Sequence, residues 1–397
     1  MFLDLIRRRN PRLIEQTIAL HQAGRLPANC YVIDLDAVEA NARHIVGSAS
    51  THQLKVFAMT KQMGRNASFC QALMRGGIGK AVAVDLECAR ATSRAGMQLG
   101  HAGHLVQAPR YEADTLARLA PDYWTVFNLE KAAEAGLAAH KLGRTQLMLT
   151  RIAARGDHFY RGHEGGFAAD DVLAVADAID KLPGARFAGI TTFPSQLFDQ
   201  DRRKVVPTQN LATLERAASA LRKAGRSQLE INTPGTVSAD ILPMLAAAGS
   251  TQVEPGHGLT GTTPLHAVED LPELPAVVYL SEVSHYSGGE AFCFGGGLYI
   301  DPVFPDYQVK AIVAREPTSA ASALSFVAIP VPASIDYYGM IDATGPTRPR
   351  IGDSVVFGFR PQAFVTRAYV VGVAGLATGK PQVETIHDAF GRPADWP

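Results

Sequence analysis

Lys61 directly follows an apolar run in the segment VFAMTKQMGRN, residues 56–66. If that run is a buried strand, the loss of solvent at its end lowers the pKa of the lysine amine, and the neutral amine is a nucleophile for an aldehyde. A lysine at a strand end can also lay its carbon chain along the surface and keep its charge in water. By itself Lys61 favours that plainer interpretation, so the choice depends on its neighbours.

Two turns that contain glycine follow β-rich runs farther along the chain. NTPGTVS (232–238) leads directly into a helical pattern, and backbone N–H groups at such a helix start bind phosphate dianions. EPGHG (254–258) is a second such turn and begins with the carboxylate of Glu254. Either turn alone is a weak signal, since Gly and Pro mostly mark ordinary turns. Together with Lys61, the turns predict a phosphorylated aldehyde cofactor held at three points, which is pyridoxal 5'-phosphate.

These groups need strands to position them, and eight short β-rich runs alternate with helix-compatible segments. The alternation is typical of parallel βαβ units and predicts an α/β fold, a TIM (β/α)8 barrel, whose catalytic residues come from the carboxyl ends of the strands. Two of the helical segments, 129–143 and 171–184, end at glycine, which commonly stops a helix. The eight runs are KVFAMT (55–60), AVAV (81–84), HLVQ (104–107), WTVF (124–127), QLMLTRI (146–152), ARFAGITTF (185–193), LEIN (229–232) and TQVE (251–254).

The remaining sequence predicts two further parts. Residues 1–30 have a helical pattern and form an N-terminal extension, and the PLP-binding barrel domain spans 31–270, beginning with an extra strand and helix at 31–47. Residues 271–397 consist of short Val-, Tyr- and Phe-rich runs separated by Gly, Pro and Asp turns, so we expect a mainly antiparallel β domain.

Composition excludes several classes of function. The 397 residues include 38 Lys and Arg and 38 Asp and Glu, so the basic surface of a nucleic-acid or membrane-surface binder is missing. No signal sequence or apolar run of membrane-spanning length is present, which predicts a cytoplasmic protein. The four cysteines form no C-x-x-C pair, so neither a zinc site nor a disulfide framework is expected; they are Cys30, Cys70, Cys88 and Cys293.

From about residue 30 to 375 the chain resembles the alanine racemase family of fold-type III PLP enzymes, most closely its YhfX-like branch. The resemblance implies a TIM barrel followed by a β domain, an amino-acid substrate, and a homodimer with active sites shared between subunits. The motifs that carry it, in order, are YVIDLDAVEANARHI, TKQMGRN, GHAGHLVQ, GITTFPSQLF, NTPGT, EPGHGLTGTTP, FCFGGGLYIDP and IDYYG.

The resemblance assigns roles to individual residues. Lys61 becomes the Schiff-base lysine and one of two proton-transfer bases. Arg65 occupies the place of a tyrosine that faces the phosphate, and its guanidinium can bind phosphate as a charged fork. The further cofactor-binding residues implied are Asn232, Thr233, Gly235, Thr236, Gly256, His257, Gly258 and Tyr338.

Glu254 departs from alanine racemase, which has an arginine at this position, and agrees with the EPG motif of related amino-acid decarboxylases. An anion beside the pyridine nitrogen raises the pKa of that nitrogen and keeps it protonated. A protonated ring is a stronger electron sink for a carbanion at Cα. Glu254 therefore opens decarboxylation as well as racemisation.

The residue on the opposite face of the cofactor is a second departure from alanine racemase. Alanine racemase supplies a tyrosine base there, whereas this sequence aligns Phe294, with Cys293 beside it. A thiol in a glycine-rich turn can return a proton, but a single cysteine in a β-rich run is equally often a small core residue. His285, Tyr286 and Tyr338 are the other candidates.

The substrate site rests on weaker signals. Arg151 or Arg155, around the fifth strand, would receive a substrate carboxylate. Asp336 matches an acidic position beside that subsite, with an interior ion pair as the competing explanation.

Neighbouring polar positions carry less weight. His101 and His104 lie near the third predicted strand, but Gln107, at its carboxyl end, is better placed to reach the cofactor. Thr192 stands where racemases have a histidine near the ring, so that function is missing or has moved to Phe193.

The sequence therefore predicts a PLP-dependent amino-acid racemase, an isomerase acting through an external aldimine and a quinonoid. Decarboxylation is the alternative, and binding of the cofactor without turnover, as in a carrier or regulator, is a third. The metal-dependent branch of the fold is disfavoured, since the predicted β domain lacks closely spaced His and Cys ligands.

Overall fold

The chain forms two compact units, each built from separate stretches of sequence. The computed structural model describes residues 1–319, 323–344 and 348–396. The barrel unit comprises residues 43–60 and 77–258, and the β unit comprises residues 1–42, 61–76 and 259–397.

The barrel unit contains a parallel sheet that closes on itself. Its first strand is interrupted at Phe57: the part before this residue pairs with β13 and the part after it pairs with β4. If these two parts count as one, eight strands surround the barrel in the described residues, which confirms the predicted fold class. The strands are β2 (Lys55–Val56), β3 (Ala58–Met59), β4 (Lys80–Ala83), β5 (Gln98–Ala102), β6 (Tyr123–Val126), β7 (Gln146–Ala153), β9 (Ala185–Thr191), β12 (Glu230–Asn232) and β13 (Gln252–Val253).

The third strand lies earlier in the sequence than predicted. The expectation of a strand at 104–107 is wrong, since β5 ends at Ala102 and the exposed Val106 belongs to the following loop. The sequence QLGHA conceals this strand because it contains a glycine. A Cβ at Gly100 would overlap the ring of Phe57. The absence of a side chain at Gly100 therefore leaves room for this buried phenylalanine.

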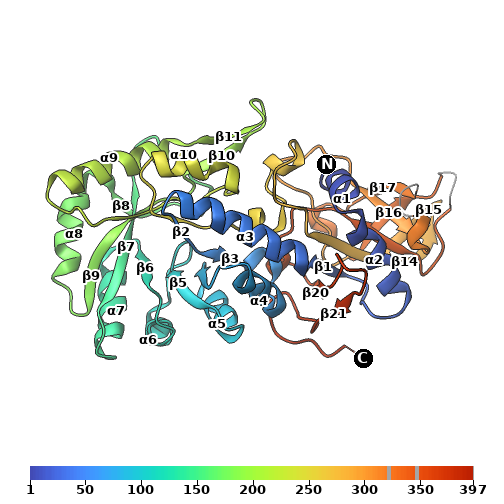
Figure 1. Cartoon of the computed structure of the whole chain (residues 1–397), viewed down its shortest axis with the longest axis horizontal. Coiled ribbons are helices and arrows are strands. Elements are labelled where there is room, and N and C mark those ends of the chain that lie inside the picture. Colours follow the sequence, from blue (N-terminus) through green and yellow to red (C-terminus); the bar gives the residue numbers. More distant parts are fainter. Residues whose placement is uncertain (320–322, 345–347, 397) are drawn as a thin grey trace. The chain divides into compact units, whose positions relative to one another are not determined.

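Helices surround the strands of the barrel unit (Figure 1). The N-cap side chains of Asp85 and Asn128 accept hydrogen bonds from backbone N–H groups three residues ahead. The two helices with predicted glycine stops end at His140 and Asp180, and Gly143 and Gly184 follow three and four residues later with φ of 68° and 67°. The helices are α5 (Leu86–Arg94), α6 (Ala113–Arg118), α7 (Leu129–His140), α8 (Val172–Asp180), α9 (Gln209–Lys223) and α10 (Leu242–Ala247). A short strand, β8 (Phe167–Ala168), pairs with β7, and β10 (Gln196–Asp199) forms a hairpin with β11 (Lys204–Pro207).

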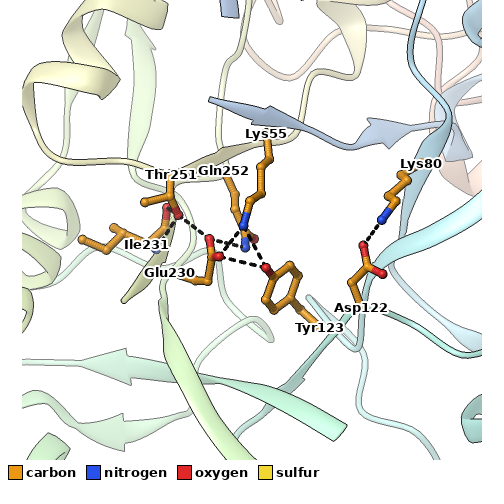
Figure 2. A network of polar contacts seen from close by, with 8 residues as sticks. All are labelled: Lys55, Lys80, Asp122, Tyr123, Glu230, Ile231, Thr251 and Gln252. Carbon is orange, nitrogen blue, oxygen red and sulfur yellow. Dashed lines mark hydrogen bonds and ion pairs between the residues drawn. The ribbon is translucent and has the colours of Figure 1, made fainter. Parts of the chain in front are cut away.

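Glu230 joins strands at the amino-terminal end of the barrel (Figure 2). Its Oε1 accepts hydrogen bonds from Lys55 and from the hydroxyl of Tyr123 at 2.8 Å. Its Oε2 accepts from Thr251 at 2.7 Å and from Gln252 at 2.9 Å. One carboxylate thus connects residues at the starts of β2, β6, β12 and β13.

Replacing Glu230 by glutamine should lower the free energy of unfolding by about 1–3 kcal/mol at neutral pH, because a neutral amide cannot accept all four hydrogen bonds. Burial alone would raise the pKa of Glu230, but its donors, Lys55 first, hold the pKa below the ordinary 4.5. The carboxylate therefore stabilises the fold above pH 4.5, and this contribution disappears as pH falls through the lowered pKa. Chemical unfolding of both proteins at neutral and acidic pH should show their difference shrinking in acid.

The pair of Lys80 and Asp122 supplies the matched control for this measurement (Figure 2). Its side chains are 40% and 37% exposed, so Asp122→Asn should change the free energy of unfolding by less than about 1 kcal/mol. If Glu230→Gln and Asp122→Asn lowered the free energy of unfolding equally, the buried position of Glu230 would add nothing to the stability of the fold.

Over the described residues, the β unit is organised by a nine-stranded sheet in which β1 (Cys30–Asp34) lies between two strands from the C-terminal part of the chain. β1 pairs antiparallel with β14 and parallel with β20. The strand that precedes the barrel in sequence therefore belongs to the other unit, and the units cross the boundaries predicted at residues 30 and 270. The remaining strands are β14 (Val277–Ser287), β15 (Glu290–Phe294), β16 (Lys310–Ala314), β17 (Leu324–Ala328), β18 (Tyr338–Asp342), β19 (Ser354–Phe357), β20 (Tyr369–Ala374) and β21 (Gln382–Val383).

Helices of the N-terminal stretch cover this sheet. α1 (Phe2–Arg9) and α2 (Pro11–Gln22) share a buried apolar cluster with β14 and β19 that includes Ile6, Ile18 and Leu280. α4 (Ala67–Arg75) also belongs to the β unit, and α3 (Leu35–Thr51) continues from the β unit into the barrel unit. In the part of the chain that the structure describes, no helix has both the length and the hydropathy needed to cross a bilayer.

Candidate active site

A buried carboxylate stands at the carboxyl end of the last barrel strand. Glu254 directly follows β13, and its side chain is 1% exposed. Its Oε1 accepts hydrogen bonds from Nδ1 of His101 and from Nδ2 of Asn232, the latter at 2.9 Å. Its Oε2 has no hydrogen-bond partner among the described residues, and Nε2 of His104 lies 3.6 Å away. One oxygen is thus held by two hydrogen bonds, whereas the other receives none from the described residues and lies at ion-pair distance from His104.

Electrostatics keep Glu254 charged. Burial raises its pKa, but the neighbouring His104, His101 and Asn232 outweigh burial and bring the pKa below its ordinary value. The site therefore holds an anion at neutral pH, as the predicted partner of a protonated ring nitrogen requires.

His101 and Asn232 are themselves fixed by threonines on neighbouring strands. Nε2 of His101 lies 2.6 Å from the hydroxyl of Thr125, and Oδ1 of Asn232 accepts a hydrogen bond of 2.8 Å from the hydroxyl of Thr191. All four of these residues are fully buried. The side chain of Asn232 is therefore directed at Glu254.

Because the third strand was predicted at 104–107, the sequence did not place these histidines at its carboxyl end. His101 is the fourth residue of β5 and His104 follows the strand, so both lie at the carboxyl end of the barrel. The expectation that Gln107 is better placed is wrong. Its amide donates to the backbone oxygens of Gly103 at 3.0 Å and Thr125 at 3.1 Å, and its Oε1 accepts from the N–H of Phe127.

The two glycine turns pack directly on their neighbours. A Cβ at Gly258 would overlap the carbonyl oxygen of Val237, so the second turn touches the first turn backbone to backbone. A Cβ at Gly235 would lie 2.5 Å from the carbonyl oxygen of Gln196. Ser238, which ends the first turn, is fully buried, and its hydroxyl has no hydrogen-bond partner among the described residues. Paired glycine turns beside an open hydroxyl are suited to an anion such as phosphate.

The other predicted phosphate contacts are placed less directly. The hydroxyl of Thr233 lies 2.8 Å from that of Ser250, so it already has a partner within the barrel unit. The N–H of Thr236 donates to the carbonyl oxygen of Gln196 at 3.2 Å. Gly256 and His257 are half-buried in the second turn.

Arg151 is a buried cation in β7, and its residue is 1% exposed. Its Nη2 donates to the carbonyl oxygens of His163 and Phe193, but Nε and Nη1 have no hydrogen-bond partner among the described residues. The guanidinium carbon lies 4.8 Å from the ring centre of Phe127 and 5.3 Å from that of Phe159. Burial lowers the pKa of Arg151 to about 10, so the group stays charged at neutral pH.

One residue connects Arg151 with the surroundings of Glu254. The ring of Phe193 meets the ring of His104 edge-on at 5.6 Å, and its carbonyl oxygen accepts the bond from Arg151. The other candidate arginine, Arg155, is exposed. A carboxylate ligand would satisfy the two open N–H sites of Arg151.

Lys61 begins the segment of the β unit that follows β3 in sequence. It opens a 3-10 turn, Lys61–Met63, and its Nζ lies 4.4 Å from the ring centre of Phe364. Arg65 lies over the same ring at 5.5 Å and has a positive φ of 53°. Both cations of the predicted cofactor site therefore share one aromatic platform.

The C-terminal tail holds this segment in place. Nδ2 of Asn66 donates to the carbonyl oxygen of Val370 at 3.0 Å and lies 3.1 Å from Nδ1 of His387. A Cβ at Gly391 would lie 2.8 Å from the carbonyl oxygen of Arg65, so the two backbones are in close contact. The position of the lysine segment thus depends on residues more than 300 positions later in the chain.

The residues predicted for the opposite face of the cofactor differ in exposure. Cys293 is fully buried in β15, and burial raises the pKa of its thiol to about 11. This placement corresponds to the core interpretation of Cys293. Phe294 is 36% exposed, and Tyr338, its partner across the sheet, packs edge-on against His285 at 4.9 Å. Tyr338 and His285 are only half-buried.

Asp336 is already engaged within the β unit. Its Oδ1 lies 3.0 Å from Nη1 of Arg367, and its Oδ2 accepts a hydrogen bond from the N–H of Gly296 at 2.9 Å. The side chains of Asp336 and Arg367 are 23% and 52% exposed, so this is not the interior ion pair of the competing explanation.

His101, His104 and Glu254 also form a group whose ligand-type atoms lie within 4.8 Å of one another. Both ring nitrogens of His101 are already occupied by Glu254 and Thr125. A metal ion would have to displace these bonds, so the group is better described as a hydrogen-bonded network.

Residues 33–264 match the family described as "Alanine racemase, N-terminal domain", and residues 278–383 match "YhfX-like, C-terminal domain". The chain belongs to the alanine racemase family. The "Uncharacterized protein YhfX" of Escherichia coli (strain K12) is 37% identical to it over 391 residues, which cover 98% of this chain and 99% of that protein. The predicted family is thereby confirmed.

Solved structures show that the family fold serves several reactions. D-threonine aldolase from Filomicrobium marinum superposes with a TM-score of 0.66 at 18% identity, covering 93% of this chain and 96% of that one. Alanine racemase from Clostridium difficile 630 gives 0.65 at 14% identity, with 91% and 99% covered. Diaminopimelate decarboxylase from Helicobacter pylori, complexed with L-lysine, gives 0.66 at 13% identity, with 92% and 96% covered.

Pyridoxal 5'-phosphate is the cofactor of the alanine racemase family, and the barrel unit fits it in two respects. The ionised Glu254 offers an unbonded oxygen to a ring N–H, and Ser238 offers a buried hydroxyl beside two glycine turns to the phosphate. Both open atoms are polar groups whose burial is costly unless a ligand completes their hydrogen bonds.

Proposed function

We propose that this family member is a PLP-dependent amino-acid racemase. The observation that carries the proposal is Arg151, a buried guanidinium with two N–H sites open to a carboxylate. A cation that holds the substrate carboxylate stabilises it as an anion, and this opposes its loss as neutral carbon dioxide. Removal of the Cα proton retains the carboxylate and gains from the same contact throughout the reaction.

The chain's own residues then have separate tasks. Lys61 bonds the cofactor through its amine and moves the Cα proton on one side of the substrate. Glu254 keeps a proton on the ring nitrogen, and the glycine turns with Ser238 bind the phosphate. When bound, pyridoxal phosphate supplies the electron sink for the carbanion at Cα.

Chain connectivity supports the task of Lys61. It is joined by a peptide bond to Thr60, which is the last residue of the first barrel-unit stretch and follows β3. The lysine thus emerges at the carboxyl end of the first strand, the end at which barrel enzymes carry their chemistry.

The group on the opposite face is proposed to come from the exposed side of the β unit. Tyr338 and His285 are accessible there, whereas the thiol of Cys293 is not. A second copy of the chain would cover this side in a homodimer, and the exposed apolar side chains of Val331, Ile335 and Tyr337 suit such an interface. Analytical ultracentrifugation tests the dimer.

Decarboxylation is the second candidate, and Glu254 is the observation that favours it. A carboxylate that keeps the ring protonated strengthens the electron sink for any bond at Cα, including the bond to the carboxylate. The two reactions differ in what becomes of the group that Arg151 binds.

Incubation with single amino acids in deuterated water distinguishes the reactions. We expect the protein loaded with cofactor to exchange the Cα proton of its substrate for deuterium and to invert the centre, with the carboxylate retained. Release of carbon dioxide would instead establish decarboxylation. If the cofactor binds but no amino acid of either configuration is changed, the protein binds its cofactor without turnover and the enzymatic proposal is wrong.

A further inference from the structure

We infer that His101 is a positioning residue: it holds one oxygen of Glu254 so that the other oxygen is presented to the ring nitrogen of the bound cofactor. The inference rests on the proposed function, because it gives Glu254 its partner. It adds a residue to the site that neither the motifs nor the family resemblance assigns.

The hydrogen bonds of Glu254 are distributed unequally between its two oxygens. A carboxylate has two oxygens, and here both protein donors, His101 and Asn232, bind the same one. Oε2 receives no hydrogen bond from the described residues. An ionised carboxylate that is 1% exposed is costly to leave half-satisfied. The asymmetry therefore defines the direction in which a ligand donor must approach.

His101 lies between two hydrogen-bond partners on different strands of the barrel. His101 lies opposite Tyr123 in the pairing of β5 with β6, and Thr125 comes two residues later on the same face of β6. The imidazole bonds this hydroxyl through Nε2 and the carboxylate on β13 through Nδ1. Since β5 and β13 are not neighbours in the sheet, His101 reaches across the barrel interior. A ring bonded at both nitrogens cannot turn without breaking one contact.

The surrounding charges agree with this role. His104 is a cation-forming group whose Nε2 lies 3.6 Å from Oε2, the oxygen that His101 does not bind. Its ring also packs against His101 at 5.4 Å and against Phe193 at 5.6 Å. Aromatic packing limits its movement toward Glu254, so the orientation of the carboxylate is set by the bonds from His101 and Asn232 to Oε1.

Two substitutions separate positioning from general structure. The terminal atoms of asparagine overlie Nδ1 of histidine, whereas those of glutamine overlie Nε2. His101→Asn therefore keeps a donor to Glu254 and loses Thr125, and His101→Gln keeps a partner for Thr125 and loses Glu254. Both remove the imidazole, so the loss of ring packing is common to the pair.

The probe is 4'-deoxypyridoxine 5'-phosphate, which has the ring nitrogen and the phosphate but no aldehyde, so its binding does not require Lys61. Its ultraviolet absorbance reports protonation of the ring as pH is varied. We expect His101→Gln to weaken binding by about tenfold or more and to lower the pH at which the bound ring loses its proton, because one charge-assisted hydrogen bond is lost. His101→Asn should remain within about threefold of the wild type.

Each outcome decides one question. If the wild-type protein does not bind the probe, the proposed function is wrong. If it binds and His101→Gln gives wild-type affinity and ring protonation, or both variants lose the same amount, the positioning role of His101 is wrong. Should either variant fail to fold, Thr125→Val and Thr125→Ser replace them. Thr125→Val should then weaken binding of the probe, and Thr125→Ser should bind it as the wild type does. Equal affinity of the two variants would overturn the inference.

Discussion

Substituting Lys61 by alanine should abolish the Schiff-base absorbance that the proposed function predicts for the reconstituted protein, and should reduce turnover by about a thousandfold or more. The expected size follows from the two tasks given to one amine, since loss of a covalent nucleophile and of a positioned proton-transfer group each costs orders of magnitude. Phosphate binding by the glycine turns is independent of the amine, so the variant should still retain cofactor noncovalently. Absorbance spectroscopy before and after gel filtration measures both effects.

Lys55 is the matched control for this experiment. It lies six residues before Lys61, at the other end of the same interrupted strand, where it pairs with Glu230. Lys55→Ala should lower stability while preserving the absorbance band. A band that persists in Lys61→Ala and disappears in Lys55→Ala would place the cofactor at the opposite end of the barrel.

Arg151→Met should decrease turnover by about a hundredfold or more and leave the protein without ligand at least as stable as the wild type. Turnover falls because the carboxylate loses its charged, hydrogen-bonded partner. Stability is retained because methionine is apolar and of similar length, and a buried guanidinium with two unbonded N–H sites is costly for the ligand-free fold. Chemical unfolding and steady-state kinetics of the same preparations provide the two readouts.

Arg151 would have a different profile if it were structural. Each aromatic contact, to Phe127 and to Phe159, is worth about 2 kcal/mol or more in a desolvated site. If Arg151 served mainly to make these contacts, Arg151→Met would lower the stability of the ligand-free protein by several kcal/mol, and such a loss would contradict the carboxylate role. Arg151→Lys serves as the control for charge. It should recover part of the substrate affinity but not the fork geometry of the guanidinium.

The fold was largely predictable because strands buried on both faces must be apolar over their whole length. WTVF and QLMLTRI satisfy this requirement, and β6 and β7 are buried at nearly every position. β5 violates the rule at Gly100, whose missing side chain accommodates Phe57 from the interruption of the first strand. The residues around Gly100 give no sign that empty space is required there. The third strand was therefore predicted too late in the sequence, and His101 was not recognised as a residue at its carboxyl end.

Pairing across the chain was the other part that local pattern could not supply. The sequence around Tyr31 predicts a strand, but nothing in it indicates that its partners begin at Val277 and Tyr369. In the same way, the identity of Cys293 does not reveal that the thiol lies inside the sheet while Phe294 faces outward. Residue type predicts what chemistry a site can do, whereas burial and partner strands decide which atoms are available for it.

The contact between the lysine segment and residues far later in the chain sets an order of events during synthesis. Asn66 and Arg65 reach their native packing only against His387 and Gly391, more than 300 positions later. Until the ribosome has added these residues, the barrel strands exist but the lysine segment lacks this support. A translation product that stops before His387 should therefore leave the lysine segment without its native packing.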